Sequence, residues 1–408
     1  MKWGNFIKVI CFSVLAIACS TDPEPSSPGG NGDQGGDTNQ DGNGGDTGGD
    51  TGGGTVQLPR IAIVGEDKDD PSSLFLITWD DEYQTSSITD IASDLNAVNP
   101  EIYPTSIESP GSFYIRQQGS AQPAFYKYDI DTAIFQTYPQ DEYFNPSATP
   151  VNLFRLANED YIHVFYLDSD NGLEQSYYHT FNVNTGESRE FPLDSVSING
   201  LNVRITEDYA FVVFEDNFSD DYELHIFDAS NGNHAIIPFD FSIYYAAMHN
   251  HLTDELYLFL NTTGCVSDYE IFDLNTFQIT GSATLQQAIC IPNIISPARF
   301  YGDKMLFQNL AASPAGPLTN PAIYDFSTGE KNTFDALEIL LELGTITGLQ
   351  AFDLIGLDAD LESETIIATF AFNENGVSKG AVAFLTYDLA LKQTVITDNI
   401  LPKTIQFR

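Results

Sequence analysis

The segment Phe181-Asn182-Val183-Asn184-Thr185-Gly186 carries the pattern that decides the fold, and Tyr324-Asp325-Phe326-Ser327-Thr328-Gly329 repeats it. In both, an aromatic residue followed by Asn or Asp ends an apolar run. The Asn or Asp side chain can accept a hydrogen bond from the backbone two residues on, and the glycine can adopt a positive φ. The pattern therefore predicts a strand that ends in a tight turn.

This pair of an aromatic residue and Asp or Asn, called the anchor below, occurs seven times from residue 57 onward. The copies are Trp79-Asp80, Tyr128-Asp129, Phe181-Asn182, Phe227-Asp228, Phe272-Asp273, Tyr324-Asp325 and Tyr387-Asp388. Their Asp or Asn positions lie 45 to 63 residues apart, with a mean of about 51. That period is typical of propeller blades. We predict an all-β domain over 57–408, a seven-bladed β-propeller of four-stranded antiparallel blades.

One blade can be traced in full, and the two ends of the domain complement each other. Residues 243–249, 255–260, 268–274 and 277–283 are expected to form its strands from the innermost to the outermost. The run 60–64 resembles a second strand, and the chain ends in a spare strand at 403–408. The C-terminal strand is therefore expected to complete the first blade and remove a free edge. Two β-sandwiches are the alternative, because their strands recur at similar intervals.

The anchor resembles part of the quinoprotein-like repeat, in which an Asp, a Thr-Gly turn and a later Trp recur. The Trp is missing from every copy here. The chain is similar to propeller lipoproteins at the level of architecture, a group that includes outer-membrane assembly scaffolds and surface proteins that hand ligands to transporters. The resemblance carries over no catalytic residue.

The charge balance excludes some partners. The chain of 408 residues has 16 Lys and Arg against 58 Asp and Glu, a formal net charge of -42. Binding to nucleic acid is not expected, because contacts to phosphate depend on clustered Lys and Arg. Anionic lipid headgroups would be repelled, so membrane attachment must be covalent or inserted. Calcium and cationic ligands remain compatible with this charge.

The first 18 residues are predicted to be a lipoprotein signal peptide. Lys2 and Lys8 precede an apolar run at 9–18 that is too short to span a bilayer. The run ends in Leu15-Ala16-Ile17-Ala18-Cys19, which resembles a bacterial lipobox, with Ala16 where Leu is usual. Cys19 is the predicted site of lipid attachment. An ordinary signal peptide followed by a chance cysteine is the alternative.

Residues 19–56 are predicted to be the lipidated cysteine and a disordered tether. Between residues 20 and 56 there are 13 Gly and seven acidic residues, with no Lys or Arg. This composition cannot bury enough apolar surface to fold. Ser20 after the cysteine indicates the outer membrane, and Asp22 with Glu24 resembles the acidic signals that send some lipoproteins to the cell exterior.

Cys265 and Cys290 are the only cysteines that remain after processing, and they are predicted to form a disulfide. Two separate thiols are the alternative. Both cysteines fall in connections from second to third strands or from one blade to the next, which share a face in a propeller. Three predicted helical segments, 91–98, 284–288 and 335–343, fall on that face too. The face is either a binding surface or a place where helices plug the central channel.

The remaining candidates for chemistry are histidines and acidic turns. His249 and His251 could hold zinc with Asp254 as a third ligand, but packed or surface histidines fit this spacing better. His179 and His225 occupy equivalent repeat positions, which indicates packing. Acidic stretches at 37–42, 67–70, 168–172, 216–221 and 358–364 could bind calcium, yet none completes a loop signature, and we interpret them as linker or solvating turns. No cofactor is predicted.

No enzyme template is present. The sequence lacks a nucleophile elbow, a His-Glu-x-x-His motif, a phosphate-binding glycine loop and a sialidase-type Asp box. The sequence therefore predicts an outer-membrane lipoprotein whose propeller binds a ligand or a protein, such as an envelope transporter, and not nucleic acid. A surface hydrolase or lyase that uses carboxylates and a divalent cation is the alternative.

Overall fold

The computed structural model describes residues 61–407, with gaps at 71–72, 80–84, 92–99, 103–111, 118–123, 131, 140–149, 158–159, 169–174, 194–195, 207, 217–221, 240–243, 261–264, 293–294, 296, 314–315, 338–348 and 362. All of these residues belong to one compact unit, Gln57–Arg408. The predicted signal peptide, Cys19 and the predicted tether lie outside the described residues and stay predictions. Within the described part, no helix is both long and apolar enough to cross a membrane.

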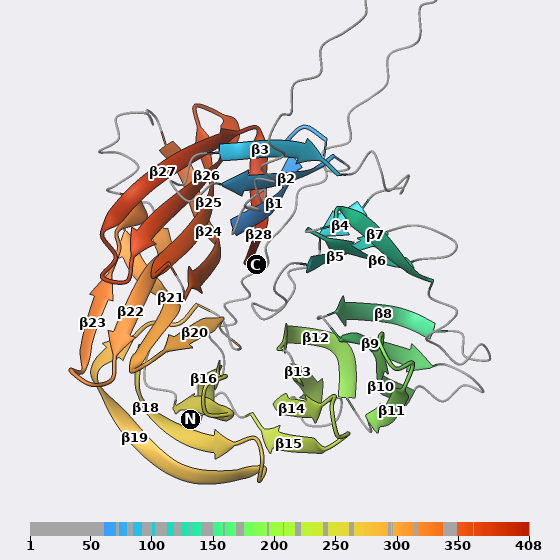
Figure 1. The fold of residues 1–408 in the computed structure, drawn as a ribbon. Coiled ribbons are helices and arrows are strands. Elements are labelled where there is room, and N and C mark those ends of the chain that lie inside the picture. The colour runs from blue at the N-terminus through green and yellow to red at the C-terminus, as the bar shows by residue number, and fades with distance from the viewer. Residues whose placement is uncertain are drawn as a thin grey trace, which may run out of the picture. The chain divides into compact units, whose positions relative to one another are not determined.

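The described residues form seven four-stranded antiparallel sheets, numbered here in chain order (Figure 1). Sheet 1 has the order β28-β1-β2-β3, and in each other sheet the four strands are consecutive neighbours. Sheets 1 to 3 contain β28 (Ile400–Phe407), β1 (Ile61–Asp67), β2 (Leu74–Trp79) and β3 (Thr85–Asp90); β4 (Pro100–Ile102), β5 (Ser112–Gln117), β6 (Ala124–Asp129) and β7 (Ile134–Pro139); and β8 (Pro150–Ala157), β9 (Tyr161–Asp168), β10 (Gln175–Asn182) and β11 (Ser188–Leu193).

Sheets 4 to 7 repeat this plan. They contain β12 (Val196–Ile205), β13 (Tyr209–Asp216), β14 (Tyr222–Asp228) and β15 (His234–Pro238); β16 (Tyr244–Asn250), β17 (Glu255–Leu260), β18 (Val266–Asp273) and β19 (Gln278–Ile289); β20 (Ala298–Tyr301), β21 (Lys304–Ser313), β22 (Gly316–Asp325) and β23 (Glu330–Thr333); and β24 (Leu349–Asp360), β25 (Thr365–Glu374), β26 (Val377–Thr386) and β27 (Leu391–Asp398).

The second strand of sheet 4, β13, is buried on both faces, which explains its continuous apolar sequence. In β13, Phe211 and Val213 join a core cluster with sheet 5, whereas Val212 and Phe214 join a cluster with sheet 3. Successive side chains of a strand point to opposite faces, so a strand between two other sheets needs apolar residues at every position. Sheets buried on both faces do not fit a pair of β-sandwiches, in which each sheet has one covered face.

Six core clusters join neighbouring sheets in sequence order. They connect sheets 3 and 4, 4 and 5, 5 and 6, 6 and 7, 7 and 1, and 1 and 2. In the cluster between sheets 7 and 1, the ring centroids of Trp79 and Phe384 lie 5.6 Å apart in an edge-to-face arrangement. Face-to-face packing of consecutive four-stranded sheets is the packing found in β-propellers.

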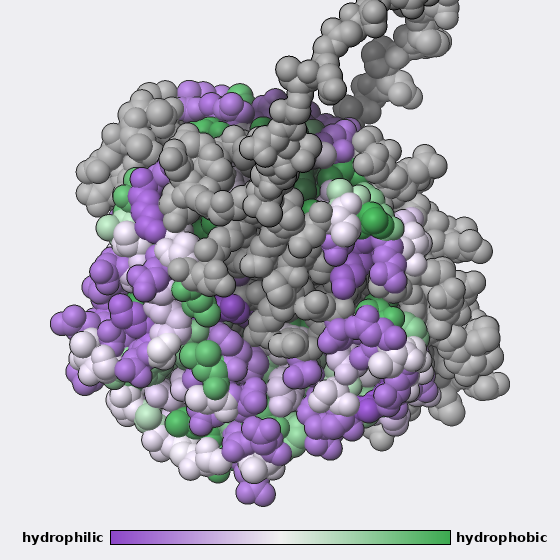
Figure 2. Space-filling model, viewed as in Figure 1, coloured by the Kyte–Doolittle hydropathy of each residue, from purple (hydrophilic) through white to green (hydrophobic). Residues whose placement is uncertain are grey.

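Outer strands behave differently, because one edge and part of their surface face solvent. Each of β3, β7, β15 and β19 exposes an isoleucine, respectively Ile88, Ile134, Ile236 and Ile279. On the face shown in Figure 2, the described surface is largely hydrophilic, with hydrophobic residues in small separate patches.

The traced blade and the pairing of the chain ends agree with the sequence prediction at the level of strands. Sheet 5 has the predicted order, with strands at positions close to those expected. The last strand, β28, pairs antiparallel with β1, in a register that runs from Ile61 opposite Phe407 to Asp67 opposite Ile400. Figure 1 shows the red β28 beside the blue β1. The first and last strands of the described chain thus share one sheet.

One predicted helix is wrong. Residues 284–288 extend β19 instead, and Thr284 pairs with Asp268 while Ile289 pairs with Val266. Leu285 is buried in the core between sheets 5 and 6. Tertiary contacts therefore override the helix propensity of the Leu-Gln-Gln-Ala run. Of the other two predicted helices, 92–98 and 338–343 lie outside the described residues, and Ala336 and Leu337 are helical.

Candidate functional site

Each sheet has two ends that differ in their connections. The turn end holds the turns from first to second and from third to fourth strands, and the loop end holds the other connections. Turns from third to fourth strands are four or five residues long in all seven sheets, whereas connections between successive sheets range from one residue, Asn399, to the fifteen residues 334–348. The turns from third to fourth strands are therefore the uniform part of the repeat.

The anchors lie at the turn end, and their side chains hold the turns together. Every anchor lies at the end of a third strand: its Asp or Asn is the last strand residue in sheets 2 to 6, Trp79 ends β2, and Tyr387 directly follows β26. In four sheets the anchor Oδ1 accepts hydrogen bonds from the backbone N–H groups two and three residues on, with Asn182, Asp228, Asp273 and Asp325 as acceptors at 2.8 to 3.2 Å. Asp129 accepts one such bond, from Thr132 at 2.8 Å. The predicted turn chemistry is confirmed.

The fourth residue after the Asp or Asn of the anchor has a positive φ in five sheets. It is glycine in three of them, Gly186, Gly232 and Gly329, and a residue with a side chain in the other two, Ala133 and Phe277. In four of the five sheets, the N–H of this residue donates to the backbone carbonyl of the anchor Asp or Asn at 2.7 to 2.9 Å. The left-handed conformation is strained for residues with a Cβ, so the turn imposes it even where glycine is absent.

A second set of hydrogen bonds, which the sequence analysis missed, joins the two turns of a sheet. The N–H of the residue after the anchor donates to the carbonyl of an Asp in the turn from first to second strand. The pairs are Val183 with Asp160, Ala229 with Asp208, Leu274 with Asp254, and Phe326 with Asp303, all at 2.8 to 2.9 Å. An Asp recurs 20 to 23 residues before each donor residue, and this spacing is the signal that could have revealed these hydrogen bonds.

A pocket of about 490 Å³ opens at the turn end of sheets 5, 6 and 7. Leu252 comes from the first turn of sheet 5, and Leu361 and Tyr387 come from the two turns of sheet 7. Sheet 6 supplies the remaining lining residues, Tyr301, Gly302, Asp303, Lys304, Asp325 and Ser327. The pocket therefore has apolar walls from its outer sheets and charged groups from the central one.

Two tyrosines form the aromatic part of the pocket. The ring centroids of Tyr301 and Tyr387 lie 4.3 Å apart. Tyr301 is only 9% exposed, and its hydroxyl has no hydrogen-bond partner among the described residues. The Tyr387 hydroxyl donates to the Asp360 carbonyl at 3.1 Å. The Tyr301 oxygen is closed off from solvent, so it is a buried polar atom without a partner among the described residues rather than a group that a molecule in the pocket can reach.

Burial and nearby carboxylates keep both phenols neutral. Burial is the main cause that raises the pKa of Tyr301 well above its usual range, with Tyr387 and the carboxylates of Asp388 and Asp325 adding to it. Burial also raises the pKa of Tyr387 to about 12. The hydrogen bond from the Ser327 hydroxyl lowers the pKa of Asp325. At neutral pH the pocket therefore presents neutral hydroxyls beside an ionised Asp325.

Lys304 is the single cation that lines the pocket. Its Nζ lies 3.6 Å from Asp388 Oδ1, and the Asp388 side chain is 90% exposed. An ion pair this exposed contributes little energy, because water and salt screen it. Asp303 and Asp325 also line the pocket, so carboxylates outnumber ammonium groups there.

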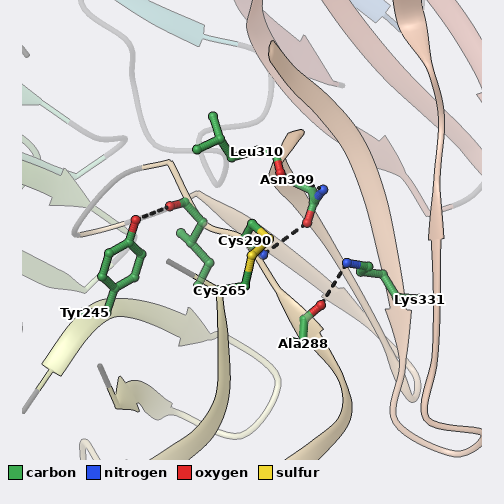
Figure 3. Close-up of a disulfide and its surroundings, with 8 residues drawn as sticks. Tyr245, Cys265, Ala288, Cys290, Asn309, Leu310 and Lys331 are labelled. Atoms are coloured by element: carbon green, nitrogen blue, oxygen red, sulfur yellow. Dashed lines mark hydrogen bonds between the residues drawn. A yellow bond between two sulfur atoms is a disulfide. The ribbon is translucent and has the colours of Figure 1, made fainter. Parts of the chain in front are cut away.

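The predicted Cys265–Cys290 disulfide is present at the loop end of sheet 5. Cys265 directly precedes β18 and Cys290 directly follows β19. Figure 3 shows the bond among contacts to sheet 6: the Cys290 N–H donates to Asn309 Oδ1 at 3.2 Å, and the Lys331 ammonium donates to the Ala288 carbonyl at 2.8 Å. The disulfide thus fastens the end of β19 to the start of β18, next to the contacts with sheet 6.

The histidines are packed rather than arranged to bind metal. Burial lowers the pKa of His163 to about 3 and those of His225 and His234 to about 4. His163 Nδ1 lies 2.8 Å from the Tyr178 hydroxyl, and His225 Nδ1 lies 3.1 Å from His234 Nε2. Histidines with such low pKa values are neutral at pH 7.

The zinc and calcium alternatives gain no support from the described residues. Burial lowers the pKa of His249 to about 3, and this ring packs against Phe211 at 5.3 Å. In the acidic turn at 67–70, Asp67 Oδ1 accepts the backbone N–H groups of Asp69 and Asp70. Within the described part of the chain, no three or more His, Cys, Asp or Glu side chains are grouped so that they could hold a metal ion. The stretches 37–42, 169–172 and 217–221 lie outside that part.

Sequence analysis had expected the binding face at the loop end, where most connections fall outside the described residues. The structure describes a pocket at the other end. Two anchor residues, Asp325 and Tyr387, line it, but they had been identified only as turn residues. No sequence pattern marks Tyr301 and Lys304 as pocket residues, because a short Tyr-Gly-Asp-Lys turn does not reveal which sheets adjoin it.

No protein-family model matches the chain, and no curated protein matches it. Among solved structures, the chain is similar to a proposed 6-phosphogluconolactonase from Bacteroides fragilis, with 12% identity, 87% of this chain and 99% of that chain covered, and a TM-score of 0.47. A quinoprotein alcohol dehydrogenase-like protein from Bacteroides thetaiotaomicron gives 14% identity, 86% and 78% coverage and a TM-score of 0.47. TolB from Acinetobacter baumannii gives 13% identity, 67% coverage of this chain and a TM-score of 0.37, and the chain spans 62% of its length.

Proposed function

We propose that this chain is an outer-membrane lipoprotein, anchored through Cys19, whose domain is a closed seven-bladed β-propeller that binds another molecule. The anchor rests on the lipobox-like segment that ends at Cys19 and on the Gly- and Asp-rich tether behind it. Ser20, Asp22 and Glu24 favour the outer membrane and its exterior face. The acidic composition disfavours nucleic acid as a partner.

Closure as a seven-bladed ring is supported by the order of the contacts. Sheets 3 to 7 follow one another through shared cores, sheet 7 packs on sheet 1, and sheet 1 packs on sheet 2. A contact between sheets 2 and 3 would complete the ring. The side chains of β4, β5 and β8 lie outside the described part of the chain, so this last interface belongs to the proposal.

The observation that carries the binding function is the pocket at the turn end, which residues of sheets 5, 6 and 7 line together. We favour capture of a ligand or protein beside an envelope transporter. The pocket carboxylates Asp303 and Asp325 keep a hydrolase or lyase as the second candidate.

Two measurements test the proposal. The mature N-terminus should carry a lipid on Cys19 and fractionate with the outer membrane, and the Cys19→Ser variant should lose both properties. A tagged full chain should then be purified from gently solubilised envelopes, with mass spectrometry of bound proteins and small molecules. A stoichiometric transporter or assembly factor supports the binding function. A clean monomer with bound metal or glycan and no protein partner favours the enzyme.

A further inference from the structure

The outer strand of sheet 5, β19, differs from the other six outer strands in length and in charge. It has twelve residues, whereas the others have four to eight, and it is the last strand on the outer side of its sheet (Figure 1). None of its residues is charged or a proline. Each other outer strand carries at least one such residue: Asp90 in β3, Pro139 in β7, Arg189 in β11, Pro238 in β15, Lys331 in β23 and Lys392 in β27.

Charges and prolines on an outer strand hinder its pairing with other chains. The outer edge of such a strand presents backbone N–H and C=O groups that can pair with a further strand, and a charge or a proline makes that pairing costly. Six of the seven outer strands carry such a residue, and β19 does not, although the net charge of the chain is -42. A long uncharged edge in so acidic a chain indicates an edge kept open for another strand.

The open part of this edge is the run 278–284. Beyond it the strand contacts sheet 6, where the Gln286 N–H donates to the Tyr324 hydroxyl at 2.9 Å. Within the run, the Ile279 side chain is 52% exposed. Gly281 lies at the centre of the run, and a glycine within a strand lets another backbone approach closely.

One irregularity lies within this run and does not cover its edge. The pairing of β19 with β18 shifts by one residue between Ile279 and Gly281, so Thr280 is the extra residue of a β-bulge. A bulge on an edge can itself hinder pairing. Here the Thr280 hydroxyl donates to the Ile271 carbonyl at 3.3 Å, so this side chain is held against its own sheet.

The charge of the chain indicates which strand pairs with this edge. Carboxylates on the edge would favour a strand of a basic protein, and the run 278–284 has none. Two copies of an acidic chain repel each other where their carboxylates meet, so they associate best along a surface without charge. Antiparallel pairing of a strand with itself is symmetric, so the same uncharged edge supplies both sides of the contact.

We propose that residues 278–284 of β19 pair antiparallel with the same residues of a second copy of this chain, so that the two copies of sheet 5 form one eight-stranded sheet. With Gly281 opposite Gly281 of the second copy, Ile279 lies opposite Ala283 of that copy. Such a contact has two-fold symmetry and closes after two copies. It adds self-association to the proposed binding function and does not involve the pocket at the turn end.

The first test is sedimentation velocity of the full chain as the Cys19→Ser variant, so that no micelle holds copies together. We expect a monomer–dimer equilibrium with a dissociation constant on the order of 10 µM, because one pair of strands is a small interface. Added salt should tighten the dimer, because it screens the repulsion between two acidic chains. A chain that stays monomeric at about 100 µM, or a dimer that salt weakens, overturns the inference.

Two variants, each with one added carboxylate, locate the contact. Ser282→Glu places a charge in the open run and should weaken the dimer about tenfold or more, because each copy then brings a carboxylate into the contact. Thr89→Glu adds the same group to an exposed position of β3 in sheet 1 and should leave the dissociation constant unchanged. Urea midpoints show that both variants are folded. Equal dissociation constants for the two variants overturn the assignment.

A cross-link tests the register and does not depend on an added charge. Gly281→Cys should form a disulfide between two copies on mild oxidation, because the central residue of the antiparallel pair faces its own copy. Gln278→Cys, at the end of the run, faces a different residue and should form little. The parent chain controls for the native cysteines. Equal cross-linking at both positions indicates random collision and overturns the pairing.

Other occupants of the edge, and failure of the proposed function, give different results. A monomeric chain that captures a stoichiometric envelope protein, and loses it in Ser282→Glu, uses β19 to bind a strand of that protein, which overturns pairing with a second copy. A chain that forms the dimer but captures no partner retains this inference and loses the proposed binding function.

Discussion

The turn end and the loop end of the sheets are built from the same strands but are stabilised in different ways. At the turn end, the turns from third to fourth strands have nearly constant length, and in four sheets local backbone N–H groups donate hydrogen bonds to the anchor side chain. At the loop end, connections vary in length, and sheet 5 is held by a disulfide and by contacts to sheet 6. Local interactions can repeat with the sequence, whereas long-range ones are specific to one pair of sheets.

The largest expected effect concerns the loop end. Replacing both Cys265 and Cys290 by Ser should lower the free energy of unfolding by about 3 to 4 kcal/mol, because the bond closes a loop with a sequence separation of 25. Urea denaturation without reductant measures the loss. Reduced wild type should match the double variant, and equal midpoints for oxidised wild type and double variant would contradict a stabilising role for the bond.

The anchors test the turn end. Asp228→Ala should lower the free energy of unfolding by about 2 kcal/mol, because the buried carboxylate accepts bonds from the backbone N–H groups of Ser230 and Asn231 and from both side chains. Asp273→Ala loses two backbone bonds at a more exposed position and should cost about 1 kcal/mol. Urea midpoints of the two variants make the comparison. A larger loss for Asp273→Ala would argue against burial as the cause.

A third test changes the pH and concerns His163. The pKa of His163 falls from an ordinary 6.5 to about 3 in the folded chain, so the unfolded chain binds more protons between these values. His163 therefore favours the fold fully above pH 6.5, and this contribution is lost as pH falls toward 3, with about 2 kcal/mol gone by pH 5.

The measurement is the urea midpoint of wild type and His163→Phe between pH 7 and pH 5. The variant loses the contact to the Tyr178 hydroxyl and starts from lower stability, but its midpoint should fall less steeply with acid. Parallel pH profiles would mean that His163 takes up a proton in the folded chain as readily as in the unfolded one.

The smallest effects come from the residue four positions after the anchor. Gly186 has a φ of 74°, and a Cβ there would meet no atom within 4 Å, so Gly186→Ala isolates the conformational cost, about 1 kcal/mol. Ala133 has a φ of 54° at the equivalent position, and Ala133→Gly should stabilise the chain by a similar or smaller amount. Thermal unfolding of both variants should show shifts of opposite sign, and shifts of the same sign would contradict a shared turn conformation.

Sequence reasoning succeeded where the cause is local. The anchors, their glycines and the strands of sheet 5 follow from side-chain type and spacing over a few residues. It failed at 284–288, where Leu285 enters a core made by another sheet and the Gln286 N–H donates to the Tyr324 hydroxyl at 2.9 Å. Helix propensity carries no information about such a partner.

By itself, the sequence determined the all-β class, the sevenfold recurrence of the anchor and the position of the turn that follows it, because an Asp or Asn oxygen needs only its own neighbouring N–H groups. The two cysteines could be paired from the sequence because no others remain after processing. Only the tertiary structure decided that the first turn of sheet 5, both turns of sheet 6 and both turns of sheet 7 meet around Tyr301. That meeting depends on how whole sheets pack face to face, which brings residues up to 135 positions apart, Leu252 and Tyr387, to the lining of one pocket.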